Sequence, residues 1–190
     1  MKTNITLFIL AFFISILLLS CTSDDSVTVI PGNNNILVSS TFEIFGRPSF
    51  EGWQPNYTDT STVNFVQTAP SSGGTFSVRL KNEWMIPGVI TYNIMGMSGT
   101  HRYKFSIWEK GSSERGIFSL GSMSFHVYHE GTVTYGNSLS FHDIPWTNQI
   151  LLDTLTTSPT DTIAVNISGS WSQSSAGYIF VDLCKLEIIE

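Results

Sequence analysis

Four histidines are the residues best suited to acid–base or metal chemistry, and their spacing argues against either role. His126 and His129 lie three residues apart. In a strand this spacing points them to opposite faces, so they make a poor pair of metal ligands. His101 and His142 are isolated, and we interpret them as surface side chains. The sequence also lacks a Gly-x-Ser-x-Gly elbow, a His-Glu-x-x-His motif and a phosphate loop.

Carboxylates are the other groups with catalytic potential. A glycoside hydrolase needs two of them facing each other across a cleft, about 5–10 Å apart, and such pairs come together only in the folded chain. Glu109, Glu130 and Asp143 are conceivable members of such a pair. Because the chain is small for a deep catalytic cleft, we expect a protein that is not an enzyme. A small glycoside-active enzyme remains the third interpretation.

The N-terminal residues predict export. Lys2 precedes a run from Leu7 to Leu19 that is apolar except for Ser15. This run is too short for a spanning helix of roughly 20 residues, but it has the size of a signal-peptide core, about 7–15 residues. It ends in Leu18-Leu19-Ser20-Cys21, which resembles the lipobox of bacterial lipoproteins. We therefore expect residues 1–20 to be a lipoprotein signal peptide.

The lipobox resemblance implies that Cys21 is acylated, for example with palmitate, and becomes the mature N-terminus. The alternative is an ordinary secretory signal with a chance cysteine. The acidic segment at residues 22–26 resembles the surface-export signal of Bacteroidetes lipoproteins. These resemblances imply a lipid anchor in the outer membrane, facing the cell surface. Residues 21–35, rich in Ser, Asp, Gly and Asn, are expected to form a flexible linker.

Charge and cysteine usage restrict the partners. The chain has nine basic and fifteen acidic residues and a net charge of -6. With no basic cluster along the sequence, this balance disfavours nucleic acid and anionic lipid as ligands. If Cys21 is lipidated, Cys184 has no partner for an internal disulfide. Since Cys184 lies in an apolar segment, we expect a buried, inert thiol.

Residues 36–190 are of a size typical of one domain, and they are rich in strand patterns. Apolar and polar residues alternate with the period of half-buried strands in several segments, namely 75–81, 90–94, 103–108, 146–155 and 162–168. Residues 178–188 are almost continuously apolar, which predicts a central strand. Residues 111–144 are assigned two strands with long loops. Many short strands separated by Gly and Pro turns predict an all-β fold, a single β-sandwich or jelly roll.

Several segments resemble landmarks of the jelly-roll carbohydrate-binding modules of families 4, 9 and 22, which have a galactose-binding-like fold. The order and spacing of these landmarks agree from about Asn35 to Ile188. Ser39 stands where an Asn is usual, and Leu183 stands where a second acidic or amide residue often follows the Asp. The landmarks are the opening strand 35–43 with Phe42-Glu43, Gly52-Trp53, Gly74 before an alternating strand, the aromatic strand 101–110, Trp146, and the closing strand 178–186 with Asp182.

The resemblance implies a structural calcium ion between the first and last strands. Glu43 and Asp182 are the matching carboxylates, and backbone carbonyls near Gly74 and Thr75 would complete the shell of oxygen ligands. The alternative is that Glu43 is a solvated edge residue and that Asp182 only hydrogen-bonds a loop.

The resemblance also implies sugar binding through aromatic side chains, which stack on the C–H face of a pyranose. Trp84 and Trp171 lie in predicted loops, and Trp108 shares a predicted strand face with Lys104 and Ser106. Trp53 and Trp146 are expected inside the domain. The candidate carbohydrate-binding residues are Trp84, Trp171, Trp108 and, less favoured, Tyr57, with Asn82, Glu83 and Gln173 as hydroxyl partners.

We therefore expect a surface-anchored, non-catalytic lipoprotein that binds a polysaccharide or another glycan. The alternative is a structural or protein-interaction lipoprotein of the cell envelope that uses the same sandwich. A flat, partly apolar patch of several hundred Å² would favour that alternative. One or two exposed Trp or Tyr faces flanked by amides and carboxylates would favour a glycan site.

Overall fold

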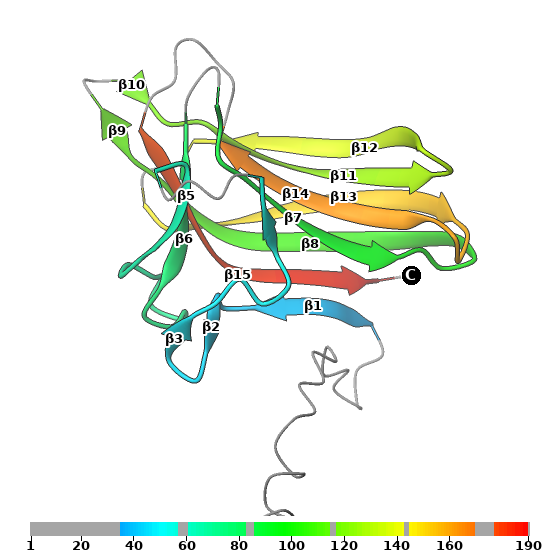
Figure 1. The fold of residues 1–190 in the computed structure, drawn as a ribbon, viewed down its shortest axis with the longest axis horizontal. Coiled ribbons are helices and arrows are strands. Elements are labelled where there is room, and N and C mark those ends of the chain that lie inside the picture. The colour runs from blue at the N-terminus through cyan, green and yellow to red at the C-terminus, as the bar shows by residue number, and fades with distance from the viewer. Residues whose placement is uncertain are drawn as a thin grey trace, which may run out of the picture. The chain divides into compact units, whose positions relative to one another are not determined.

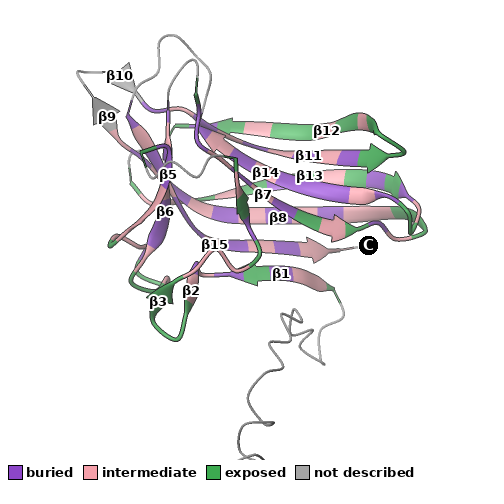
Figure 2. Cartoon of the chain, viewed as in Figure 1, coloured by how far each residue is buried: buried purple, intermediate pink, exposed green. Residues whose placement is uncertain are grey.

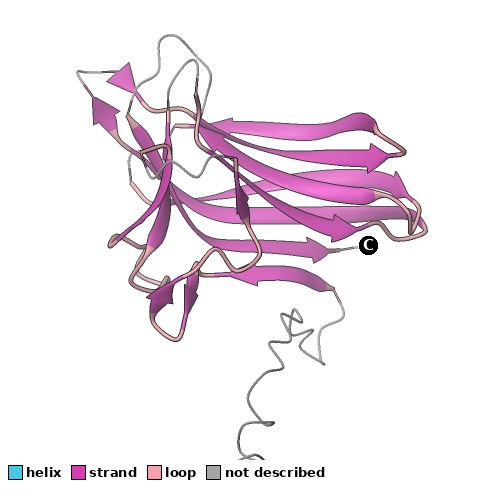
Figure 3. Ribbon diagram, in the orientation of Figure 1, coloured by secondary structure: helices cyan, strands magenta, loops and turns pink. Residues whose placement is uncertain are grey.

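A computed structural model describes residues 35–56, 61–82, 86–114, 117–142, 145–169 and 177–189, and of residues 113, 114, 117 and 118 it describes only the backbone. This part of the chain is built of strands and loops (Figure 3). Two antiparallel sheets, of six and five strands, form its body (Figure 1). The described residues include no helix long and apolar enough to cross a membrane.

The six-stranded sheet is organised around its central strand, which is the one predicted from residues 178–188. This strand, β15, pairs with three others, β8, β6 and β1. The pairing of β1 with β15 joins the first and last strands of the domain, with Ser40 opposite Cys184. The strands are β13 (Thr147–Thr157), β8 (Gly99–Gly111), β15 (Tyr178–Ile188), β6 (Ser77–Lys81), β5 (Val63–Val66) and β1 (Ile36–Ser40).

The five-stranded sheet contains the hairpin that the sequence left least defined. Strands β11 and β12 are joined by Glu130 and Gly131, whose φ angles of 45° and 81° give the left-handed turn that suits a two-residue hairpin loop. The strands are β12 (Thr132–Phe141), β11 (Gly121–His129), β14 (Thr162–Gly169), β7 (Val89–Met95) and β4 (Gln54–Pro55). Two small hairpins complete the fold, β2 (Glu43–Ile44) with β3 (Arg47–Pro48), and β9 (Ser113–Glu114) with β10 (Ile117–Phe118).

The core lies between the two sheets. Phe105 of β8 and Phe125 of β11 meet there with ring centroids 6.3 Å apart, and Trp53 packs on Phe105 at 6.1 Å. Figure 2 shows the underlying alternation, with buried and partly exposed residues following one another along β8. Trp53 is buried as predicted, whereas Trp146 is only half-buried. Cys184 is buried, in agreement with the expectation of an inert thiol.

Candidate functional site

The structure tests some of the predicted site residues and leaves others untested. Trp108, Asn82, Glu43 and Asp182 are described. The predicted lipidation residue, Cys21, lies outside the described residues, as do the ligand-binding candidates Trp84, Trp171, Tyr57, Glu83 and Gln173.

Trp108 lies on the outer face of the six-stranded sheet. Its strand neighbours in the core, Ile107 and Glu109, are fully buried, whereas Trp108 is half-buried. Trp108 stands opposite Asn148 of β13 and Asp182 of β15. The prediction that Trp108 shares its face with Lys104 and Ser106 is therefore confirmed.

Asn82 does not fit the role predicted for it. It is only 3% exposed, and its side-chain amide donates a hydrogen bond to the carbonyl of Leu120. Its backbone N–H donates to the carbonyl of Gly177 at 2.9 Å. Asn82 therefore ties neighbouring loops together, and it is not available to a ligand hydroxyl.

Glu43 and Asp182 each lie against one of two adjacent glycines in the loop before β6. A Cβ atom on Gly74 would lie 2.1 Å from Oε2 of Glu43, and one on Gly73 would lie 2.3 Å from Oδ2 of Asp182. No larger residue fits at these distances, so the glycines let the loop close over the carboxylates. The structure thus brings together the two residues that the resemblance pairs.

Asp182 is fully buried and incompletely paired. Its Oδ1 accepts a hydrogen bond from the backbone N–H of Leu183 at 2.7 Å, while its Oδ2 is buried without a hydrogen-bond partner. Burial, together with the negative charges of Glu43 and Glu51, raises the pKa of Asp182 to about 7. At pH 7 the protonated and the ionised forms of this carboxyl are therefore both populated.

Glu51 is the third carboxylate of this cluster, and the sequence analysis did not identify it. Its Oε2 accepts hydrogen bonds from the backbone N–H of Phe42, at 2.8 Å, and from the hydroxyl of Ser40. Three non-glycine residues at the cluster have left-handed backbones, Phe42 (φ 55°), Glu51 (φ 50°) and Leu183 (φ 50°). Such conformations are unfavourable for residues with side chains and concentrate at functional or ligand-holding sites.

These groups suit a hard cation such as Ca²⁺, which takes oxygen ligands. The oxygen donors, the glycine cradle and the unpaired Oδ2 of Asp182 all fit. Among the described residues, no three His, Cys, Asp or Glu side chains form a metal site by themselves, so backbone carbonyls and water would have to contribute. At Glu43 the loop presents the N–H groups of Thr75 and Phe76, which donate to Oε1.

The outer face of the five-stranded sheet carries a group of aromatic side chains that the sequence analysis also missed. We name this group, Tyr128, Tyr135 and His126, the tyrosine face. Tyr135 stands opposite His126, with ring centroids 4.9 Å apart and planes at 81°. Tyr135 is 74% exposed and Tyr128 is 39% exposed. Partial burial lowers the pKa of His126, which favours its neutral form at pH 7.

Hydroxyl and amide groups flank the tyrosine face on the neighbouring strands. The hydroxyl of Thr91 donates to Oδ1 of Asn166 at 2.6 Å, and the hydroxyls of Ser122 and Ser168 lie 2.8 Å apart. Gln54 of β4 stands opposite Thr91 and is exposed. The face therefore offers exposed rings beside a row of uncharged hydrogen-bonding groups.

The carboxylates considered for catalysis do not face each other. Glu109 is buried near one end of β8, where it accepts a hydrogen bond from the side chain of Gln149 at 3.2 Å. Glu130 is exposed in the β11–β12 turn, beside the loops at the opposite end of β8. Ten residues of strand separate the two ends, which corresponds to roughly 30 Å. Asp143 lies outside the described residues.

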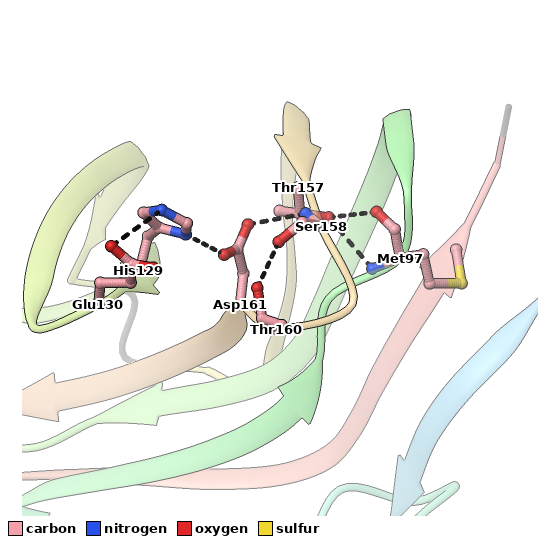
Figure 4. Close-up of polar contacts among 7 residues, drawn as sticks. All are labelled: Met97, His129, Glu130, Thr157, Ser158, Thr160 and Asp161. Atoms are coloured by element: carbon pink, nitrogen blue, oxygen red, sulfur yellow. Dashed lines mark hydrogen bonds and ion pairs between the residues drawn. The ribbon is translucent and has the colours of Figure 1, made fainter.

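His129 and Asp161 form an ion pair that joins the turns at one end of the sandwich (Figure 4). His129 Nδ1 lies 2.5 Å from Oδ1 of Asp161, whose Oδ2 accepts the N–H of Ser158 at 2.7 Å. In the adjacent contact, Thr157 donates to the carbonyl of Met97 at 2.7 Å. The hydrogen bond and charge of Asp161 raise the pKa of His129. The N–H of Ser158 and the side chain of His129 lower the pKa of Asp161.

No family model matches this chain, and no curated protein matches it in sequence. Among solved structures, it is similar to the CBM22-1 xylan-binding domain from Paenibacillus barcinonensis Xyn10C, with a TM-score of 0.56 and 14% identity over 82% of this chain and 95% of that one. The CBM22-2 domain of the same protein gives a TM-score of 0.56 and 12% identity over 80% of this chain and 99% of that one.

A third similar structure contains the CBM22-1 and GH10 modules of Clostridium thermocellum endo-1,4-beta-D-xylanase 10B complexed with xylohexaose. The TM-score is 0.56 with 14% identity over 82% of this chain, which spans 29% of the length of that chain. These likenesses confirm the predicted fold, the jelly-roll sandwich of carbohydrate-binding modules.

The His129–Asp161 pair predicts a pH-dependent contribution to stability. The raised pKa of His129 stabilises the folded protein below the ordinary value of 6.5, and this effect disappears as the pH rises through the raised pKa. Because its pKa is lowered, Asp161 stabilises the folded protein above pH 3.8, the ordinary value for an aspartate. This contribution to stability is lost as the pH falls through the lowered pKa. His129→Gln should therefore lower the melting temperature at pH 5.5 and change it little at pH 9.

The matched control is His142→Gln, which alters an exposed histidine at another position. It should leave the melting temperature unchanged at both pH values. A loss in His129→Gln that is equally large at pH 9 would show that the histidine acts by packing and not by its charge.

Proposed function

We propose that this chain is a non-catalytic glycan-binding protein whose ligand lies on the tyrosine face. The observation that carries the proposal is the exposed ring of Tyr135 beside His126, flanked by uncharged hydroxyl and amide groups. The fold supports the same conclusion, because two similar structures are described as xylan-binding domains.

Binding would be passive. The apolar C–H face of a sugar ring would stack on Tyr135, with Tyr128 offering a second surface nearby. Asn93 of β7 is exposed and stands opposite Ala164, which stands opposite His126. Hydroxyls of the sugar would exchange hydrogen bonds with water for hydrogen bonds with the side chains of Asn93, Gln54 and the serines of β11. No bond needs to break, and Glu109 and Glu130 are too far apart to act as an acid–base pair.

The observed face favours a glycan over the protein-interaction alternative. A protein-docking patch would be expected to be flat and partly apolar over several hundred Å². Val133, Ala164 and the exposed Met95 add some apolar surface near Tyr128. The rest of the face, along Ser122, Ser124, Ser168, Asn166 and Thr91, provides hydrogen-bonding groups at close intervals. Such groups are costly to bury against the apolar surface of another protein, because each would lose its hydrogen bonds to water and need a new hydrogen-bonding group.

The test is the affinity of the full chain, in a nonionic detergent, for xylan and for a neutral glycan array. Tyr135→Ala should reduce binding by about fivefold, because stacking of a sugar on one aromatic ring is worth on the order of 1 kcal/mol. Tyr135 is so exposed that its removal should leave the melting temperature unchanged. Phe45→Ala, at a fully exposed aromatic in the β2–β3 turn, is the control and should bind normally.

The roles of Trp84 and Trp171 in ligand binding stay predictions, as do those of Tyr57, Glu83 and Gln173. The same affinity measurement, made on variants of these residues, tests them. If Trp84→Ala or Trp171→Ala abolishes binding while Tyr135→Ala does not, the ligand lies on the loops and not on the tyrosine face. If the folded wild-type protein binds no neutral glycan at all, the protein-interaction alternative becomes the better one.

We further propose that Glu43, Asp182 and Glu51 help to hold a structural Ca²⁺ ion. The buried, unpaired Oδ2 of Asp182 and the glycine cradle support this proposal. A bound ion would offset the repulsion among the three carboxylates and fix the loop before β6 against β15. Because Asp182 is inaccessible to solvent, the ion would act on stability and not by touching a ligand.

Removal of the ion is therefore expected to destabilise the fold. Calcium at 100 times its Kd contributes about 2.7 kcal/mol, so EDTA should lower the melting temperature by roughly 5–10 °C. Asp182→Asn should fold but lose this response. Glu130→Gln, which neutralises an exposed carboxylate at a distant turn, should keep it. An identical melting temperature with calcium and with EDTA would refute the calcium site.

The sequence supports a third proposal, that Cys21 is acylated and anchors the protein to the outer membrane at the cell surface. In cells fed a labelled palmitate analogue, the wild-type protein should carry the label and sediment with membranes. Cys21→Ser should do neither, while Cys184→Ser, at the other cysteine, should behave as wild type in both assays. Cleavage by protease added to intact cells would support surface exposure, and full protection would contradict it.

A further inference from the structure

Strand β12, which carries the exposed ring of Tyr135, contains a bulge next to that residue. In the pairing of β12 with β11, the register shifts by one residue between Tyr135 and Ser138. The two residues between them, Gly136 and Asn137, therefore face the single residue Phe125 of β11. A Gly-Asn pair is typical of the turn between two strands. Here the pair lies inside a strand and forms the bulge.

The bulge determines the direction in which Tyr135 points. Tyr135 stands opposite His126 and Ser138 stands opposite Ser124, and both of these β11 residues lie on the outer face, between buried neighbours. Tyr135 and Ser138 are three residues apart, so in a regular strand they would point to opposite faces. The extra residue changes the alternation, and bulges at sheet edges often redirect a side chain in this way. Without the bulge, Tyr135 would face the inside of the sandwich.

A side chain of the other sheet holds this bulge in place. Oδ2 of Asp153, on β13, accepts a hydrogen bond from the backbone N–H of Asn137 at 2.7 Å. The side-chain amide of Asn137 donates in turn to the carbonyl of Leu152 at 2.9 Å. Strands β12 and β13 are edge strands of different sheets. The two hydrogen bonds therefore join the sheets at the bulge itself.

Gly136 makes this contact between the sheets possible. A Cβ atom at this position would lie 2.3 Å from Oδ2 of Asp153 and 3.0 Å from Cβ of Phe125. A larger residue would have to displace the carboxylate on one side or the core side chain on the other. The glycine thus lets β12 approach Asp153 closely enough for the hydrogen bond from Asn137.

The position of Asp153 in its strand indicates a specific role for its carboxylate. Asp153 stands opposite the fully buried Tyr103, so it points to the inside of the sandwich. The inward positions on either side of it hold the buried Leu151 and Leu155. A carboxylate adds nothing to an apolar core, and it is costly there unless it is hydrogen-bonded. Its hydrogen bond to the bulge accounts for an aspartate at this position.

We propose that Asp153 is a positioning residue of the tyrosine face, which holds the bulge and thereby keeps Tyr135 turned outward against His126. This inference rests on the proposed function, because it concerns the ring on which the sugar would stack. Asp153 does not touch the ligand, since it lies on the inner side of β13 and the ring lies on the outer side of β12. It makes a site on the five-stranded sheet depend on a residue of the six-stranded sheet.

The first measurement needs no ligand and uses the NMR signals of the histidine rings, with the full chain in a nonionic detergent. The ring of His126 lies 4.9 Å from that of Tyr135, edge to face, so the tyrosine ring current shifts its proton signals. Asp153→Ala should move these signals in the direction in which Tyr135→Ala moves them. Gly136→Ala, which perturbs the same contact from the other strand, should do the same.

The second measurement is the affinity for xylan. Asp153→Ala should weaken binding by up to about fivefold, the loss expected for Tyr135→Ala itself. Because Asp153 acts through that ring, Asp153→Ala/Tyr135→Ala should bind as weakly as Tyr135→Ala alone. Asp153→Asn, which keeps one acceptor oxygen for the N–H of Asn137, should restore both the His126 signals and most of the affinity.

Asn148→Ala is the matched control. Asn148 also lies on β13, and its amide also donates to a backbone carbonyl, that of Ile107 at 3.2 Å, but this hydrogen bond stays within the six-stranded sheet. The variant should leave the His126 signals and the affinity for xylan unchanged, even where the melting temperature falls.

Three results would overturn the positioning role. The first is a folded Asp153→Ala protein with unchanged His126 signals. The second is a loss of xylan affinity in Asp153→Ala that adds fully to the loss in Tyr135→Ala. The third is self-association of Asp153→Ala with unchanged His126 signals, which would show that the carboxylate protects a sheet edge. If the wild-type protein binds no xylan but Asp153→Ala moves the His126 signals, the positioning role is supported and the proposed function fails.

Discussion

The pairing of β15 with three neighbours is the constraint from which the candidate sites follow. Because β1 lies against the second half of β15, the chain entering the domain is brought next to the chain leaving it. Asp182 lies in the middle of β15, at the bulge, and is covered by the glycine loop before β6. The same bulge turns Lys185 outward. One irregularity in one strand therefore sets the positions of both Asp182 and Lys185.

The two outer faces of the sandwich differ in chemistry although they enclose the same core. On β11, every second residue is buried against β8 and β13, and the residues between them are Ser, His and Tyr. On β8, the residues between the buried ones are Arg, Lys, Ser and Trp. Because each sheet buries only one side, the opposite sides are free to differ without cost to the core. A sandwich can in this way carry different side chains on its two outer faces.

Local patterns in the sequence predicted the strands well, and for a physical reason. The period of two reflects burial on one side of a sheet, so β6, β7, β8, β13 and β14 were predicted from it, as was the outward position of Trp108. β15 was predicted from its nearly continuous apolar run. Properties that depend on register could not be predicted in this way. The contact of Tyr135 with His126 and the approach of Glu51 to Asp182 both need strand pairing or a bulge that a short segment does not specify. Asn82 was misassigned because its burial depends on loops distant in sequence.

The carboxylate cluster and the tyrosine face belong to different parts of the sandwich, and this separates stability from binding. The cluster is attached to the six-stranded sheet, whereas the tyrosine face is on the outer side of the five-stranded sheet. With its pKa near 7, the carboxyl of Asp182 gains or loses a proton near neutral pH, on a different sheet from the solvent-exposed rings. The left-handed residues around it, Phe42, Glu51 and Leu183, are held by the contacts of that cluster. A cation there would therefore rigidify the junction of the first and last strands, and it would influence a ligand on the tyrosine face only through the stability of the domain.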